Sequence, residues 1–378
     1  MRRAAMLCCL LISALSAGTA YSQTSPDSNK QQTATPSGLQ IGIVAPFDGN
    51  YALIAKQIRL GAEAANQQSA QPVTFTYFQE SCKSTQDAAT AEKIRLANIR
   101  LVIGYVCSES LEAAAPVLAR DNIAILSLGS RQRTLAEQQT KQNFGIFRLQ
   151  ADRTAAISVL AEQLSPIWRT VPFALIEDGT VQGRDFARQV LGAFKARGLE
   201  PAFTDTYRPA QPAQTSLIAR LKRAGIHHVL LGGEGDDASI IARSAAAANH
   251  PLTIAGSDTL LRADPLNPLP AGLLMSAIPE PELQSNAAEA VKAIDIYARQ
   301  NTETAELQTE TYALLAYAAM QIAGEALTLP TDKPLAEFLR KNHFETATGA
   351  VSFTPQGLRR ENPYRLLRFN GKVFELSE

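Results

Sequence analysis

The feature that most constrains the fold is a regular alternation of short apolar segments with longer amphipathic ones. The short segments are rich in β-branched and apolar side chains, which is typical of strands buried on both faces; they lie at 39–46, 73–79, 100–106 and 122–128. Between the first two, residues 51–68 carry apolar side chains at helical spacing. This strand–helix order predicts an α/β fold with a parallel sheet and right-handed crossovers.

A second series of the same kind begins near residue 171. Its apolar segments again alternate with helical patterns, at 171–178, 201–207, 227–233 and 252–258. Two series of similar size predict two doubly wound lobes. Further helical patterns follow, and residues 364–376 read as a β-hairpin with its turn at Asn370-Gly371. Trp168, the only tryptophan, follows a helical pattern and is expected on the surface of its lobe.

The N-terminal residues have the pattern of a secretory signal peptide. Arg2 and Arg3 precede an apolar stretch and then small residues, and the stretch is too short to span a membrane. We expect cleavage near Ser22, with Ala20 as the alternative site, so that residues 1–22 form the signal peptide. Residues 23–38 are rich in Ser, Thr, Gln and Pro and are expected to form a flexible leader. The mature protein is therefore predicted to be soluble and exported to the periplasm.

The charge balance argues against two classes of partner. Of 36 basic residues, two leave with the signal peptide, so that 34 face 36 acidic residues, a net charge of −2. Such a balance gives no electrostatic basis for binding nucleic acid or an anionic membrane.

Two cysteines remain after export, Cys82 and Cys107, because Cys8 and Cys9 lie inside the signal peptide. The segment "GYVCSES" at 104–110 leaves three interpretations of Cys107 open: a nucleophile, a metal ligand or half of a disulfide. An even cysteine count in an exported chain favours a disulfide over a free thiol pair. The four histidines are scattered, and none has ligand spacing to the cysteines, so we predict neither a metal site nor a cofactor.

Ligands of open parallel sheets bind outside the carboxyl ends of the strands. In this chain that rule selects the loops at 45–51, 104–110, 127–132, 176–183, 232–237 and 255–258. Ser108 is a candidate N-cap whose hydroxyl and amide would hold an anionic group, or a helix cap that touches no ligand. The "GGEGDD" loop lacks the spacing of a dinucleotide-binding motif, so no nucleotide site is predicted.

Several of these segments together resemble the periplasmic leucine/isoleucine/valine-binding proteins. They are "LQIGIVAPFDGNYALIAKQIRLGAEAAN", "GYVCSES" with a cysteine 25 residues upstream, "LIARLKRAGIHHVLLGG", "AGSD" and "GAVSFTPQG", in the family's order. The resemblance implies the type I periplasmic-binding-protein fold, a Cys82–Cys107 disulfide that fixes the loop bearing Ser108, and a monomer. It also implies an amino-acid ligand and an ABC transporter permease as membrane partner.

The resemblance implies specific roles for residues at the loops. Ser108 matches the serine that binds the ligand carboxylate, and Asp258 matches the acid that binds its ammonium group. Gly129 matches a small residue whose backbone meets the ligand. Arg131 stands where the family has a hydroxyl residue, and Glu234 where it has an aromatic one, and these are departures.

The two departures favour a ligand more polar than leucine, such as a polar amino acid or an amide. Arg131 would supply a bidentate carboxylate clamp, and Glu234 would add a negative charge. The alternative is that the two side chains pair with each other or point to solvent. Tyr51 would cover the ligand, or would serve only packing. Gln182 would reach inward to the ligand, or would only cap its helix.

Hinge closure of two lobes around the ligand is the expected mechanism. The chain is expected to pass between the lobes near 148–151, 276–280 and 349–352. These boundaries assign 39–149 and 279–350 to lobe 1, and 150–278 and 351–378 to lobe 2.

The chain is not expected to be an enzyme. A hydrolase would need a base near Ser108 or Cys107, but only His250 approaches a predicted ligand loop, and no G-x-S-x-G motif is present. The remaining alternative is a soluble periplasmic sensor that acts through a membrane partner.

Overall fold

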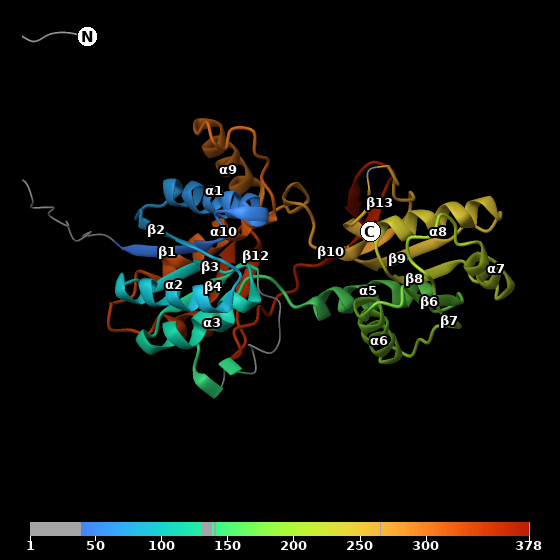
Figure 1. The fold of residues 1–378 in the computed structure, drawn as a ribbon, viewed down its shortest axis with the longest axis horizontal. Coiled ribbons are helices and arrows are strands. Elements are labelled where there is room, and N and C mark those ends of the chain that lie inside the picture. Colours follow the sequence, from blue (N-terminus) through green and yellow to red (C-terminus); the bar gives the residue numbers. More distant parts are fainter. Residues whose placement is uncertain (1–38, 130–137, 140, 265, 378) are drawn as a thin grey trace, which may run out of the picture. The chain divides into compact units, whose positions relative to one another are not determined.

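The computed structural model describes residues 39–377 except 130–137, 140 and 265. In this part of the chain, five parallel strands form a first sheet in the order β2-β1-β3-β4-β5 (Figure 1). Their bounds are Gln40–Ala45 for β1, Thr74–Gln79 for β2, Leu101–Gly104 for β3, Ala124–Ser127 for β4 and Ile146–Arg148 for β5.

Helices bury both faces of this sheet. Alternate strand residues such as Ile41 and Ile103 pack with helices α1 (Ala52–Gln68) and α10 (Thr311–Ala326). The residues between them, such as Val44 and Val102, pack with α2 (Ser84–Leu96) and α3 (Ser108–Leu118) on the other face. The near-continuous apolar runs of the sequence follow from this double burial, because successive strand side chains point to opposite faces.

C-terminal segments complete this first lobe, which we define as the first sheet with the elements packed on it. Helix α9 (Ala288–Gln300) packs on α1, and α11 (Leu335–Lys341) contacts α10. Strands β11 (His343–Thr346) and β12 (Gly349–Ser352) form an antiparallel pair.

A second sheet of seven described strands has the order β14-β13-β10-β9-β8-β6-β7. The strands from β7 to β10 are parallel, and β13 and β14 add an antiparallel hairpin at one edge, as the Asn370-Gly371 turn predicts. The bounds are Phe173–Glu177 (β6), Phe203–Thr206 (β7), His228–Gly232 (β8), Thr253–Ser257 (β9), Leu274–Ala277 (β10), Arg365–Phe369 (β13) and Phe374–Leu376 (β14).

Helices cover both faces of the second sheet as well, and together they form the second lobe (Figure 1). Helices α5 (Arg153–Trp168) and α6 (Val181–Lys195) pack on one face, and α7 (Thr215–Arg223) and α8 (Gly235–Ala247) pack on the other. Four described 3-10 turns also occur, at Gly49–Tyr51 (η1), Ala119–Asp121 (η2), Asp258–Leu261 (η3) and Pro281–Leu283 (η4). The predicted α/β architecture with two doubly wound lobes is confirmed.

Three expectations about local structure differ from what the structure shows. The chain passages expected near 148–151 and 276–280 each begin inside a strand that the sequence analysis does not predict. These strands, β5 and β10, are short and fully buried, and they lie next to β4 and β9. Trp168 is not on the surface: it is 3 % exposed and packs on Phe173. Its burial follows from the helical stripe Leu160, Leu164 and Trp168 on α5, which faces the sheet.

The third passage between the sheets lies beyond the 349–352 expected from sequence. Val351 and Phe353 pack in the core of the first lobe. Tyr364 and Leu366 pack in the core of the second. The amide of Arg360 still donates to the carbonyl oxygen of Ser352 (3.0 Å), whereas the side-chain amide of Asn362 donates to the carbonyl oxygen of Ala155 in the second lobe (3.0 Å). We therefore place this passage between residues 360 and 362.

Among the described residues, no helix combines the length and the apolar character needed to cross a membrane. The predicted signal peptide (1–22) and leader (23–38) lie outside the described residues.

Candidate functional site

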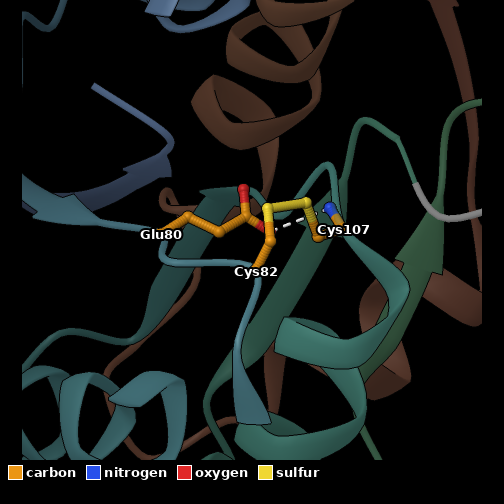
Figure 2. Close-up of side chains that lie close together, drawn as sticks. All are labelled: Glu80, Cys82 and Cys107. Carbon is orange, nitrogen blue, oxygen red and sulfur yellow. Dashed lines mark hydrogen bonds between the residues drawn. A yellow bond between two sulfur atoms is a disulfide. The ribbon is translucent and has the colours of Figure 1, made fainter. Parts of the chain in front are cut away.

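A disulfide joins Cys82 to Cys107 at the carboxyl edge of the first sheet, with their Cα atoms 5.5 Å apart (Figure 2). It links the segment after β2 to the loop that starts α3. Cys107 is therefore neither a nucleophile nor a metal ligand in this form of the protein. The helix begins one residue earlier than predicted: Cys107 has extended backbone angles and occupies the N-cap, and Ser108 is the first helical residue.

Glu80 is a residue of this site that sequence reasoning missed. Its side chain is 1 % exposed, and one of its oxygens accepts a hydrogen bond from the backbone amide of Val106 (3.0 Å). Its other oxygen accepts from the backbone amide of Cys107 (2.9 Å) (Figure 2). Burial raises the pKa of its carboxyl group to about 7, although these two hydrogen bonds act in the opposite direction. The signal was an acidic residue two positions before Cys82, directly after β2, the edge strand of the first sheet.

A second buried acid supports the same loops. Asp87, in the first turn of α2, accepts hydrogen bonds from the Ser110 hydroxyl (2.8 Å) and from the amides of Ser81 (2.8 Å) and Lys83 (2.9 Å). These contacts hold the chain on either side of Cys82, whose φ of 56° is unusual for a residue with a side chain. The disulfide is thus one of several restraints on the loop that presents Ser108.

Glu80 and the two cysteines also form a cluster whose ligand atoms lie within 4.8 Å of one another. Because the two sulfurs are bonded to each other, neither is a thiolate available to a metal ion. His250 is buried, and its Nε2 lies 2.7 Å from the carbonyl oxygen of Ile226.

Gly129, predicted from the family resemblance, lies in the loop after β4. Its amide donates to the carbonyl oxygen of Tyr105 (3.3 Å), and a Cβ at this position would lie 2.4 Å from the Cα of Val106. Any larger residue would therefore push the loop after β4 away from the loop that leads to Ser108. Tyr51 is 54 % exposed in η1, after β1. Ser108, Gly129 and Tyr51 thus all lie in segments that follow strands of the first sheet.

The second lobe has a pocket of about 330 Å³ at the carboxyl ends of its strands. Gln182, Glu234 and Asp258, all predicted from sequence, line it from the starts of α6, α8 and η3. Ile157 and Phe186 add apolar surface, and Asp178 and Arg153 add charges. The fold therefore brings together residues that lie up to about a hundred positions apart in the chain.

Local hydrogen bonds shape one wall of this pocket. Asp178 Oδ1 accepts from both the amide (2.9 Å) and the hydroxyl (2.7 Å) of Thr180. The Thr180 hydroxyl in turn accepts from the amide of Gly183 (2.9 Å) and so caps α6. A Cβ on Gly183 would lie 2.1 Å from Asp178 Oδ1, so the helix approaches this carboxylate as closely as a glycine allows.

Glu234 forms a salt bridge with Arg262 (3.0 Å) in which both side chains are about half exposed. A pair with Arg131 was one of the two alternatives from sequence, and Arg131 lies outside the described residues. Asp258 is partly buried at the start of η3, beside Thr259, whose hydroxyl donates to the carbonyl oxygen of Gly233 (2.7 Å).

The comparisons with known proteins agree with this architecture. A profile of the periplasmic binding protein family matches residues 38–372. The chain belongs to the periplasmic binding protein family. A "Leu/Ile/Val-binding protein homolog 2" of Brucella abortus is 22 % identical over 340 residues, which cover 86 % of this chain and 89 % of the relative.

Two solved structures share the fold of this periplasmic binding protein. The putative branched-chain amino acid ABC transporter protein of Rhodospirillum rubrum has a TM-score of 0.75 at 16 % identity and covers 90 % of this chain and 100 % of its own. An ABC transporter substrate-binding protein of Desulfitobacterium hafniense in complex with leucine has a TM-score of 0.68 at 18 % identity, with the same two coverages.

The chain is thus a binding protein rather than an enzyme, and its family is periplasmic.

Proposed function

We propose that this periplasmic binding protein captures an amino acid, or a polar amide related to one, by closing its two lobes around the ligand. The observation that carries the proposal is the second-lobe pocket, in which Gln182, Glu234 and Asp258 converge from the starts of three helices. Relatives with names that specify leucine, isoleucine and valine support the ligand class.

The first lobe would bind the ligand carboxylate. Ser108 is the first residue of α3, where backbone amides and the positive end of the helix dipole favour an anion. Glu80 accepts from the amides of Val106 and Cys107. The groups proposed for the ligand carboxylate are the Ser108 hydroxyl and the later amides of the first turn of α3. Tyr51 would cover the ligand from the loop after β1.

The second lobe would bind the ligand ammonium. Asp258 and Glu234 give the pocket carboxylates, and burial of an ammonium group against them requires that it be paired. The two lobes would close by a hinge motion at the three places where the chain passes between them, and this closure would complete the site. The closed form would present a docking surface to the membrane permease, with the protein acting as a monomer.

A thermal-shift screen tests the ligand class. The mature protein, unfolded and refolded to remove carried-over ligand, is scanned with amino acids, small amides and dicarboxylates. A ligand at a hundredfold excess over its Kd stabilises the native state by about 2.7 kcal/mol, so a true ligand should stand clear of the others. We expect one amino-acid class to respond.

Variants of the two lobes then test the site. Ser108→Ala and Asp258→Ala should each abolish the shift, whereas Ser158→Ala and Asp332→Ala, at exposed positions outside the pocket, should leave it unchanged. A well-folded protein that responds to no amino acid or amide would refute the proposal. Uptake of the ligand in vesicles that contain the permease would separate transport from a sensing role.

A further inference from the structure

Arg153 lines the second-lobe pocket, and the proposed function assigns it no role. It is the first residue of α5, and its side chain is exposed. Within the described part of the chain, the Arg153 side chain makes no hydrogen bond or salt bridge. It is therefore available to a ligand.

The position of Arg153 is not explained by helix stability. A positive side chain in the first turn of a helix opposes the helix dipole, which favours acidic residues there. The N-cap of α5 is supplied by Asp152, whose side chain accepts a hydrogen bond from the amide of Thr154 (3.0 Å). The helix is thus capped without Arg153.

Two of the acidic residues that line the pocket already have arginine partners. Asp185 pairs with Arg188, and Glu234 pairs with Arg262. Asp178 accepts only from Thr180, an uncharged residue, in the described structure. Among the described residues, Arg153 therefore lines the pocket without an anionic partner, and Asp178 lines it without a cationic one.

A ligand that complements this pattern carries both an ammonium group and an anion beyond its α-carboxylate. The ammonium group would face the carboxylates, and the α-carboxylate would face Ser108 in the first lobe. A guanidinium binds a carboxylate through two parallel hydrogen bonds, which fixes the geometry as well as the charge. Ile157 and Phe186 give the apolar surface that the methylene groups of such a side chain require.

We propose that Arg153 binds a side-chain carboxylate of the ligand, so that the protein selects an acidic amino acid over its uncharged analogues. The inference rests on the proposed function, because it assumes that the ligand is an amino acid held by both lobes. It adds the chemical class of the ligand and the residue that selects it.

Titration calorimetry with aspartate, glutamate, asparagine, glutamine and leucine tests this selection. Each acid and its amide have nearly the same shape, so a difference in Kd reports the charge. Hydrogen bonds to charged groups are worth about 1.5–3 kcal/mol, or about tenfold to a hundredfold in Kd. We expect one of the two acids to bind at least tenfold more tightly than its amide.

Arg153→Gln should abolish this preference. The variant should bind the acid about tenfold to a hundredfold more weakly, and its Kd for the matching amide should change less than about twofold. The control is Arg169→Gln, which removes an arginine at the other end of α5 and outside the pocket, and which should leave both affinities unchanged. Arg153 is exposed, so the variant is expected to fold, and its circular dichroism spectrum checks this.

Other outcomes separate this inference from the proposed function. If the wild-type protein binds leucine or an amide as tightly as the acids, the selection by Arg153 is refuted and the proposed function stands. If Arg153→Gln weakens all amino acids equally, Arg153 binds the α-carboxylate and the inference is again overturned. If no amino acid binds the wild-type protein, the proposed function fails, and the inference fails with it.

Discussion

The carboxylate of Glu80 accepts a hydrogen bond of 2.9 Å from the backbone amide of Cys107. The same residue, Cys107, is covalently bonded to Cys82, two positions after Glu80. A disulfide and a buried acid therefore act on a single residue, the N-cap of α3, immediately before Ser108. This relationship determines how firmly the first lobe holds its candidate ligand loop, and two predictions follow from it.

The first prediction concerns the disulfide. It closes a loop with a sequence separation of 25 residues, which restricts the unfolded chain and stabilises the fold by about 3 kcal/mol. The double variant Cys82→Ser, Cys107→Ser should lose this amount in its free energy of unfolding, measured with urea. Reductant should destabilise the wild-type protein by a similar amount and leave the double variant unchanged. Equal stability of the two proteins without reductant would contradict the prediction.

The second prediction concerns pH. The pKa of Glu80 is raised to about 7 by burial, whereas an unfolded glutamate titrates near 4.3. The native state therefore binds more protons between these two values, so this contribution to stability is complete below about pH 4.3 and is lost as pH rises to about 7. The expected loss is about 3 kcal/mol relative to Glu80→Gln, which cannot titrate.

Unfolding free energies of the two proteins at pH 5 and pH 8 check this sign. Glu109→Gln, at an exposed position in the first turn of α3, should keep the pH dependence of the wild-type protein. Parallel pH profiles for the wild-type protein and Glu80→Gln would show that Glu80 does not titrate in this range.

The third prediction concerns the wall of the second-lobe pocket. Gly183→Ala would place a Cβ 2.1 Å from Asp178 Oδ1 and 2.9 Å from the carbonyl oxygen of Gly232. Neither the helix nor the strand end can accommodate it, so Asp178 must move and ligand affinity should fall at least about tenfold, a cost of about 1.4 kcal/mol. Calorimetry with the ligand from the screen measures this loss.

Gly192→Ala is the matched control. It lies on the same helix, and a Cβ there meets no atom within 4 Å. This variant should leave affinity unchanged and raise the free energy of unfolding by about 0.5–1 kcal/mol, because alanine loses less backbone entropy than glycine in a helix. Equal affinities of the two variants would show that the approach of Gly183 to Asp178 is not needed for binding.

Sequence patterns predicted those parts of the fold that depend on local periodicity. The buried strands, the helices between them and the Asn370-Gly371 hairpin each carry a signal within a few residues. Strands β5 and β10 were missed because a three- or four-residue strand is too short to show a period, and its burial depends on distant neighbours. Trp168 was misplaced although Leu160 and Leu164 lie on the same helical stripe.

The site was predictable only in part, because some of its residues depend on neighbours that are distant in the chain. The strand-end rule predicted the segments from which Gln182, Glu234 and Asp258 line the second-lobe pocket, because the carboxyl ends of parallel strands meet at one edge of a sheet. Their role in ligand binding stays a prediction. Glu80 and Arg153 were missed because their roles depend on which amides and charges surround them, and the sequence does not show this.

The sequence by itself determined the two α/β lobes, the pair of cysteines available for a disulfide and the loops at which a ligand would bind, because strand alternation and helical spacing are local properties of the chain. Only the tertiary structure decided that Glu80 holds the start of α3, that Glu234 pairs with Arg262, and that Arg153 lines the pocket without a partner among the residues the structure describes. These are contacts between residues 26 or more positions apart, or the absence of such contacts, and they depend on packing rather than on any short pattern.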